Sequence, residues 1–228
     1  MQQTIMTIEH ICDILLDQKL ILPEQKPFII SKESEQRVKL KRIISLKSRD
    51  TRPTGNNSHE VTPVDIISSL KLKTPTKKEE VTEELIMEAI AENLGLAYKK
   101  INPLELDLDV VTRMIAKPFA LKHLVVPIAL EDGELKVAMY NPLNHEALDD
   151  VKRVTRVKVT PVVCTKTDIL KIITEFYGFK SSIVAAERDL VSPLVDLGNL
   201  EQYTKLKSGH EIESTDQHVK NAVDYLLN

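Results

Sequence analysis

The stretch between Thr82 and Gly178 constrains the fold most, because it carries helix and strand signals in a fixed order. Thr82 is a good N-cap residue and Gly95 is a good C-terminal stop, and apolar side chains recur between them at helical spacing. Two strand-like runs, 125–130 and 135–140, are then joined through Asp132 and Gly133, a pair that is typical of a tight hairpin turn. We therefore expect a helix followed by an antiparallel hairpin.

The rest of this stretch predicts further helices and one more strand. A short helix is expected over 108–114, after which Lys117 and Pro118 break the chain. Asn144 is placed to cap a helix, and the segment from 157 to 163 alternates apolar and polar residues as a strand does. A last helix is expected over 169–177, with Gly178 as its stop.

The two prolines in the strand-like runs indicate where those strands lie. Pro127 and Pro161 cannot donate hydrogen bonds to a neighbouring strand, so we expect their strands either to be edge strands or to meet the sheet only at their ends. The sequence thus predicts an α+β fold of the α/β sandwich type. Its small mixed or antiparallel sheet is packed by helices and preceded by an α-helical N-terminal region.

The chain is expected to divide into five segments. Residues 7–19 have the apolar spacing of an amphipathic helix, and 52–60 is polar and rich in turn residues. The predicted segments are an N-terminal helical segment (1–50), a flexible linker (51–62), an α/β domain (63–178), a second linker (179–213) and the start of a following domain that is absent (214–228).

Several classes of function are excluded by composition and motifs. The net charge of −3 argues against a nucleic-acid binder held by a basic face. None of the six glycines is followed by lysine, so the phosphate-binding loop of an NTPase is missing and no catalytic residues are expected. The six histidines lack metal-site spacing, which predicts no metal. Cys12 and Cys164 suggest free thiols in a reducing cytoplasm.

A basic segment runs from Arg37 to Arg52, with seven lysines and arginines against one acid, Asp50. Apolar residues are interleaved with these charges, so a basic amphipathic helix that touches anionic lipid or a phosphate-bearing ligand is one interpretation. The other is the solvated face of a packed helix. The second is favoured, because no aromatic residue accompanies the charge.

The residues from Thr82 to Tyr98, followed by Val126-Pro127-Ile128, by 137–142 and by 159–163, resemble the N-terminal domain of type II secretion and type IV pilus assembly ATPases. The resemblance covers roughly 63–177. In addition, 11–25 looks like the first half of the helical repeat that precedes this domain, and 216–227 looks like the start of the next one. The resemblance implies that a motor domain lies beyond Asn228.

In one branch of this family the helical repeat binds cyclic di-GMP, and the present sequence departs from the motif of that branch. His10, Ile11 and Cys12 stand where the repeat has Arg-Leu-Gly, Lys19 replaces a glycine, and Asn93 replaces a glutamine. The glycine would let a ligand approach the backbone, and the arginine would bind a phosphate or a guanine. We therefore expect no cofactor, with cyclic di-GMP as the alternative.

The resemblance implies a non-catalytic interaction and assembly domain that docks the motor on the cytoplasmic region of an inner-membrane secretion or pilus protein. The alternatives are a cyclic di-GMP sensor and a plain scaffold. In the sensor alternative the candidate nucleotide contacts are His10, Arg37, Lys41 and Arg42. We expect a cytoplasmic protein, peripheral to the bacterial inner membrane through its partners, and a monomer or dimer.

Overall fold

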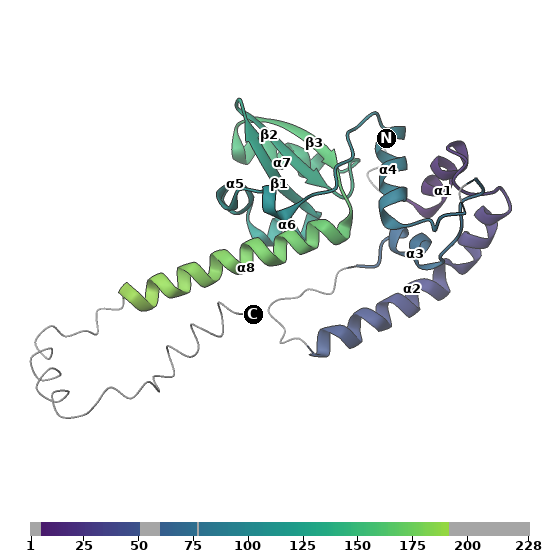
Figure 1. Cartoon of the computed structure of the whole chain (residues 1–228), viewed down its shortest axis with the longest axis horizontal. Helices are drawn as coiled ribbons and strands as arrows, with labels where there is room; N and C mark the ends of the chain where they lie inside the picture. The colour runs from purple at the N-terminus through teal and green to yellow at the C-terminus, as the bar shows by residue number, and fades with distance from the viewer. Residues whose placement is uncertain (1–5, 51–59, 77, 192–228) are drawn as a thin grey trace, which may run out of the picture. The chain divides into compact units, whose positions relative to one another are not determined.

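The computed structural model describes residues 6–50, 60–76 and 78–191, and it has the α+β fold that the sequence predicts. A three-stranded sheet of order β1-β2-β3 is surrounded by helices (Figure 1). The first four helices of the described residues are α1 (Ile8–Asp17), α2 (Gln25–Asp50), α3 (Pro63–Ser69) and α4 (Glu83–Asn93). The N-terminal region is therefore helical, as expected.

The expected caps organise these helices. Thr82 accepts a hydrogen bond from the Leu85 amide at the start of α4, and Gly95 follows its C-cap with a φ of 64°. Thr7 caps α1 through the amide of His10. At α3, Thr62 and Asp65 form a reciprocal capping box, in which each side chain accepts from the other residue's amide.

The hairpin is formed by β1 (Val125–Glu131) and β2 (Glu134–Met139), which pair antiparallel. Asp132 and Gly133 take φ values of 49° and 76° in the turn, as a tight hairpin requires. Helix α7 (His145–Thr155) then crosses to β3 (Lys158–Val163), which pairs parallel with β2. The sheet is therefore mixed, and β2 is its central strand. Pro127 and Pro161 lie in the edge strands, which confirms the prediction from proline.

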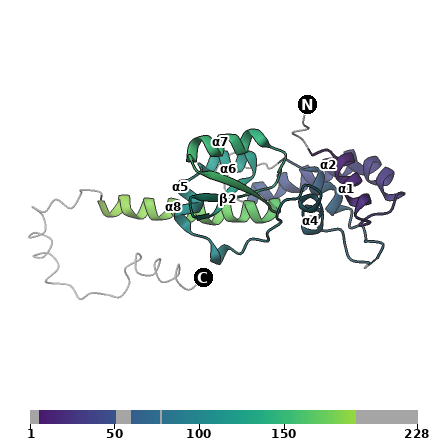
Figure 2. The ribbon, with the colours of Figure 1, turned by 90° about the horizontal axis from the view of Figure 1, so that it is seen from above.

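One continuous apolar core joins the N-terminal helices to the sheet. Its fully buried members include Ile11 and Leu15 of α1, Ile86 of α4, and Leu135 of β2. In Figure 2, α7 and α8 (Lys166–Val191) lie on opposite sides of the sheet. Because β2 is covered on both faces, its residues 137–139 are all buried, whereas the outer end of β1 is exposed.

Helix α8 is held against the short helix α5 (Leu108–Arg113) by hydrogen bonds from two of its side chains. The buried Tyr177 hydroxyl lies 2.6 Å from the Ile115 carbonyl oxygen and 3.0 Å from that of Val111. Lys180 Nζ donates to the Thr112 carbonyl at 3.1 Å. The Val111 and Thr112 carbonyls belong to the last turn of α5, and Ile115 follows its C-cap, Met114. The last carbonyls of a helix have no partner within the helix, so α8 satisfies acceptors that would otherwise be unpaired.

Two local predictions were wrong. Gly178 does not end the last helix: α8 continues through it to Val191, so the first part of the predicted linker 179–213 is helical. Lys117 and Pro118 do not break the chain but begin a further helix, α6 (Lys117–His123), in which proline occupies the first turn. The basic segment lies in the second half of a longer helix, α2, which begins at Gln25.

The five predicted segments stay predictions. Most of the linker 51–62 and the whole of the predicted following domain, 214–228, lie outside the described residues. The shared core places α1 and the sheet in one compact unit, residues 1–181, although the sequence had suggested a separate N-terminal segment.

Candidate functional site

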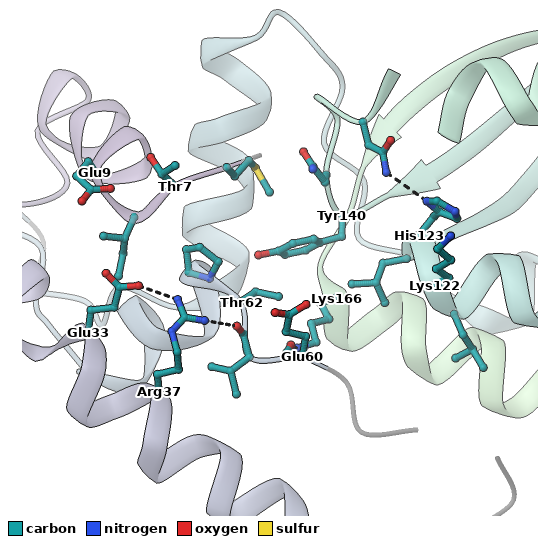
Figure 3. Close-up of a pocket in the computed structure, with 18 residues that line it drawn as sticks. Thr7, Glu9, Glu33, Arg37, Glu60, Thr62, Lys122, His123, Tyr140 and Lys166 are labelled. Atoms are coloured by element: carbon teal, nitrogen blue, oxygen red, sulfur yellow. Dashed lines mark hydrogen bonds and ion pairs between the residues drawn. The ribbon is translucent and has the colours of Figure 1, made fainter. Parts of the chain in front are cut away.

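A partly open pocket of about 540 Å³ lies between the N-terminal helices and the end of β2 (Figure 3). Its walls combine apolar and polar side chains from several elements. They are Met6, Thr7, Ile8, Glu9, Glu33, Arg37, Glu60, Val61, Thr62, Pro63, Leu121, Lys122, His123, Leu124, Tyr140, Asn141, Asn144 and Lys166. This volume falls in the range of sites that hold small organic ligands.

Tyr140 supplies a buried hydroxyl to this pocket. The residue is only 6% exposed, and its hydroxyl makes no hydrogen bond with any residue that the structure describes. Burial raises the pKa of Tyr140, so the hydroxyl stays protonated; Thr62 and the Val64 amide oppose this shift, but neither has the geometry of a hydrogen bond. An unpaired buried hydroxyl is destabilising, and a ligand acceptor would satisfy it.

Lys166 is the buried cation of the pocket, at 6% exposure. Its Nζ lies 2.6 Å from Asp65 Oδ2 and donates to the Glu60 carbonyl oxygen at 2.9 Å. The same Asp65 oxygen accepts from the Thr62 amide at 2.8 Å. Asp65 therefore caps α3 and neutralises the first residue of α8, which ties these two helices together.

Arg37 is the only one of the four sequence-predicted contacts that lines the pocket. Its guanidinium lies 2.7 Å from Glu33 Oε1 and donates to the Val61 carbonyl at 3.0 Å (Figure 3). His10 is half-buried on α1, and Lys41 and Arg42 are exposed further along α2, outside the pocket. The structure therefore does not bring the four predicted residues together.

His123 lies at the rim of the pocket, where α6 ends. Its ring stacks on Phe119 with centroids 4.4 Å apart, and Nδ1 is 3.4 Å from Asn144 Nδ2. Burial, and then the nearby charge of Lys122, lower the pKa of His123, so the imidazole is neutral at neutral pH. His123 is therefore a neutral polar residue at the edge of the core.

Lys19 gives a structural reason for the glycine that the family repeat has at this position. It follows the C-cap of α1 with a φ of 56°, as Gly95 does after α4 with a φ of 64°. Left-handed backbone after a helix is the usual role of glycine. Lysine thus adopts here a backbone conformation that glycine takes more easily.

Neither cysteine lines the pocket. Burial raises the pKa of Cys12 to about 11 and that of Cys164 to about 12, so both thiols stay protonated. Within 6–50, 60–76 and 78–191, no three His, Cys, Asp or Glu residues are arranged to hold a metal ion. In the same ranges, no helix is both long and apolar enough to span a bilayer.

Sequence reasoning missed Tyr140, Lys166 and Asp65 as site residues. A signal existed for Asp65, because Thr62-Pro63-Val64-Asp65 has the spacing of a capping box. The sequence gives no comparable signal that Lys166, 101 residues further on, is the partner of Asp65.

Comparisons with known proteins place this chain in a family context. The model of the MshEN domain matches residues 94–183. The type IV pilus assembly ATPase PilB of Myxococcus xanthus is 28% identical over 144 residues, which are 63% of this chain and 24% of the relative. TfpB, a type IV pilus assembly ATPase of Acinetobacter baylyi, is 20% identical over 139 residues, 60% of this chain and 24% of the relative. The match thus spans about a quarter of these curated relatives.

Two solved structures are similar at low identity. The structure of MshE with cdg has 14% identity and a TM-score of 0.44, covering 75% of this chain and 99% of that one. The N-terminal domain of XpsE has 18% identity and a TM-score of 0.44, covering 76% and 96%. Over residues 94–183 the chain thus resembles the MshEN domain, and in sequence it is related to type IV pilus assembly ATPases, which agrees with the predicted resemblance.

Proposed function

We propose that this relative of the pilus assembly ATPases is a non-catalytic assembly module, which docks a motor on the cytoplasmic region of an inner-membrane secretion or pilus protein. One observation carries the proposal: the buried side of α8 continues as an exposed apolar stripe. In this function the chain acts in the cytoplasm, peripheral to the membrane through its partner, as a monomer or dimer. The absence of any Gly-Lys step in the sequence supports a non-catalytic role.

The stripe on α8 follows helical spacing. Ile172, Phe176 and Phe179 lie four and three residues apart, and therefore on one side of the helix. Ile172 is 1% exposed and Phe176 packs against the core, whereas Phe179 is 53% exposed. Two further apolar residues of α8, Ile183 and Val184, are also exposed, at 37% and 38%. A run of uncovered apolar side chains is typical of an interaction surface.

The substitution Phe179→Ser tests the docking proposal. We expect it to weaken binding to the cytoplasmic region of the partner at least tenfold, because interface energy concentrates in large buried aromatic residues. The measurement is isothermal titration of the purified chain against the cytoplasmic regions of the inner-membrane proteins of its own secretion or pilus system. Leu104→Ser is the matched control, because Leu104 is 93% exposed and outside α8. Equal affinities of the two variants would contradict the proposal.

A second candidate function is a cyclic di-GMP sensor, which the pocket favours. A sensor needs a preformed pocket beside the N-terminal helices with cationic walls, and the pocket there includes Arg37, Lys122 and Lys166. The unpaired hydroxyl of Tyr140 offers a donor to a ligand oxygen (Figure 3). Against this, Arg37 and Lys166 are already paired with carboxylates, so the pocket has little free positive charge for two phosphates.

Titration of the chain with cyclic di-GMP, with GTP and ATP as controls, tests the sensor function. If the chain is a sensor, binding should be selective and micromolar, and Tyr140→Phe should weaken it about tenfold, since this change removes one hydrogen bond to a charged or strongly polar group. The variant keeps the ring and its packing, so its fold is preserved. Equal heats for all three nucleotides, or none from the folded protein, would exclude this candidate.

A further inference from the structure

The outward side of α2 carries a surface that the proposed function leaves unexplained. Val38, Lys39, Arg42, Ile43 and Leu46, here called the outer face of α2, follow the spacing i, i+1, i+4, i+5 and i+8 and therefore share one side of the helix. All five are exposed. The three apolar members are 70%, 41% and 53% exposed in chain order, although the other side of α2 packs its apolar residues against the core.

The cations of α2 differ between the two halves of the helix in whether they form ion pairs. In its first half the cations are paired: Lys26 with Asp13, Lys32 with Glu35 at 2.7 Å, and Arg37 with Glu33 at 2.7 Å. Beyond Arg37, the side chains that the structure describes include three cations and no acid, and none of the three forms an ion pair with a described residue. These cations are Lys39, Lys41 and Arg42. The second half of α2 is thus a positive surface with exposed apolar residues.

We propose that the outer face of α2 binds directly to an anionic lipid bilayer. Its apolar side chains would enter the boundary between headgroups and acyl chains, while lysine and arginine extend their charged ends to the lipid phosphates. Charge complementarity selects this partner, because beyond Arg37 the described side chains of α2 include three cations and no acid, and the exposed Glu35, one turn before Lys39, is paired with Lys32. Each cation near an anionic membrane strengthens binding about fivefold.

The combination of exposed cations and exposed apolar residues favours a bilayer over other polyanions as the partner. A nucleic acid would use Lys39, Lys41 and Arg42 but would leave Val38 and Leu46 in water. Only a partner with an apolar layer beneath a negatively charged one uses both sets of side chains. No described helix crosses a bilayer, so this contact is interfacial and adds to docking through a protein partner.

Flotation of the whole chain with vesicles tests the proposal. We expect it to float with phosphatidylcholine vesicles that contain about one third phosphatidylglycerol, less so when the salt concentration is raised to screen the charges, and not with pure phosphatidylcholine. Lys39→Glu with Arg42→Glu should reduce binding at least 25-fold. Ile43→Ser with Leu46→Ser should reduce binding about tenfold or more, because it removes the apolar contact.

The matched control is Lys152→Glu with Arg153→Glu on α7, which changes the net charge equally at exposed positions. It should keep most of the binding. The proposal is overturned if the α2 and α7 charge variants bind the vesicles equally, or if the serine variant binds them as well as the unmodified chain. It is also overturned if the folded, unmodified protein does not bind anionic vesicles. Because Phe179 is not on α2, the docking titration remains a separate readout.

Discussion

Replacing Asp65 with alanine is expected to lower the free energy of unfolding by about 3 kcal/mol, because its carboxylate makes two stabilising interactions. It caps α3 through the Thr62 amide at 2.8 Å, and it neutralises the buried Lys166 at 2.6 Å. Loss of the cap alone costs about 1 kcal/mol. The remainder comes from a buried ammonium group left without its counter-charge. Chemical denaturation followed by circular dichroism measures the difference.

Asp107→Ala is the control that separates these two contributions. Asp107 caps α5 by accepting from the amides of Asp109 and Val110 at 2.7 and 3.1 Å, in an exposed position and without a buried cation. Its loss should therefore cost only about 1 kcal/mol. If Asp65→Ala costs no more than Asp107→Ala, then the ion pair with Lys166 does not stabilise the fold in the way its burial indicates.

Leu15→Ala in α1 is expected to destabilise the sheet together with the helix, by about 2–5 kcal/mol in a single transition. Leu15 is 0% exposed and belongs to the same apolar core as Leu135 of β2. Truncating it leaves a cavity in a core that both regions share, so both should unfold together. Thermal unfolding, followed by the far-ultraviolet signal and by hydrogen exchange of the sheet amides, measures this coupling.

The nearby Leu22→Ala serves as the control for Leu15→Ala. Leu22 is 40% exposed, and its truncation should cost less than about 1 kcal/mol. Two separate transitions in the Leu15 variant, with the sheet unaffected, would contradict the shared core. That outcome would instead support the N-terminal segment 1–50 as a domain of its own, as the sequence suggested.

The elements that the sequence predicted well depend on neighbouring residues. Thr82 and Asn144 cap the helices that follow them, and Asp132 with Gly133 forms the turn between paired strands. Each of these caps and turns is determined by interactions within a few residues, so the local sequence is sufficient to predict it. The edge positions of Pro127 and Pro161 were also predictable, because a missing amide hydrogen restricts a strand wherever it lies.

The predictions that failed concern glycine and proline, whose effects depend on packing. Glycine within a helix costs about 1 kcal/mol relative to alanine, and packing outweighs such a cost. On either side of Gly178, Tyr177 and Lys180 bind carbonyl oxygens at the end of α5, which holds α8 in place. Pro118 was interpreted as a break, but proline in a first turn requires no amide donor and therefore suits the start of α6.

The pocket was the least predictable feature, because it combines residues that are distant in sequence. Arg37 was identified from its charge, whereas Tyr140 stood at the end of a predicted strand and Lys166 lay between a predicted strand and a predicted helix. Their burial arises only when α8 meets α3 and β2 ends beside the N-terminal helices. A pattern of residue types within one segment does not indicate which distant elements it will contact in the folded protein.

The hydrogen bond and the ion pair of Lys166 also affect the order in which parts of the molecule fold. They join residues 101 and 106 positions apart, whereas β1 and β2 are connected by a two-residue turn. Closing a long loop costs more chain entropy than closing a short one, so the hairpin is favoured to form before the Lys166 contacts. Contacts that form after the rate-limiting step govern mainly how fast a protein unfolds. The Asp65–Lys166 pair would then mainly slow unfolding. Its loss should shorten the lifetime of the native state more than it slows folding.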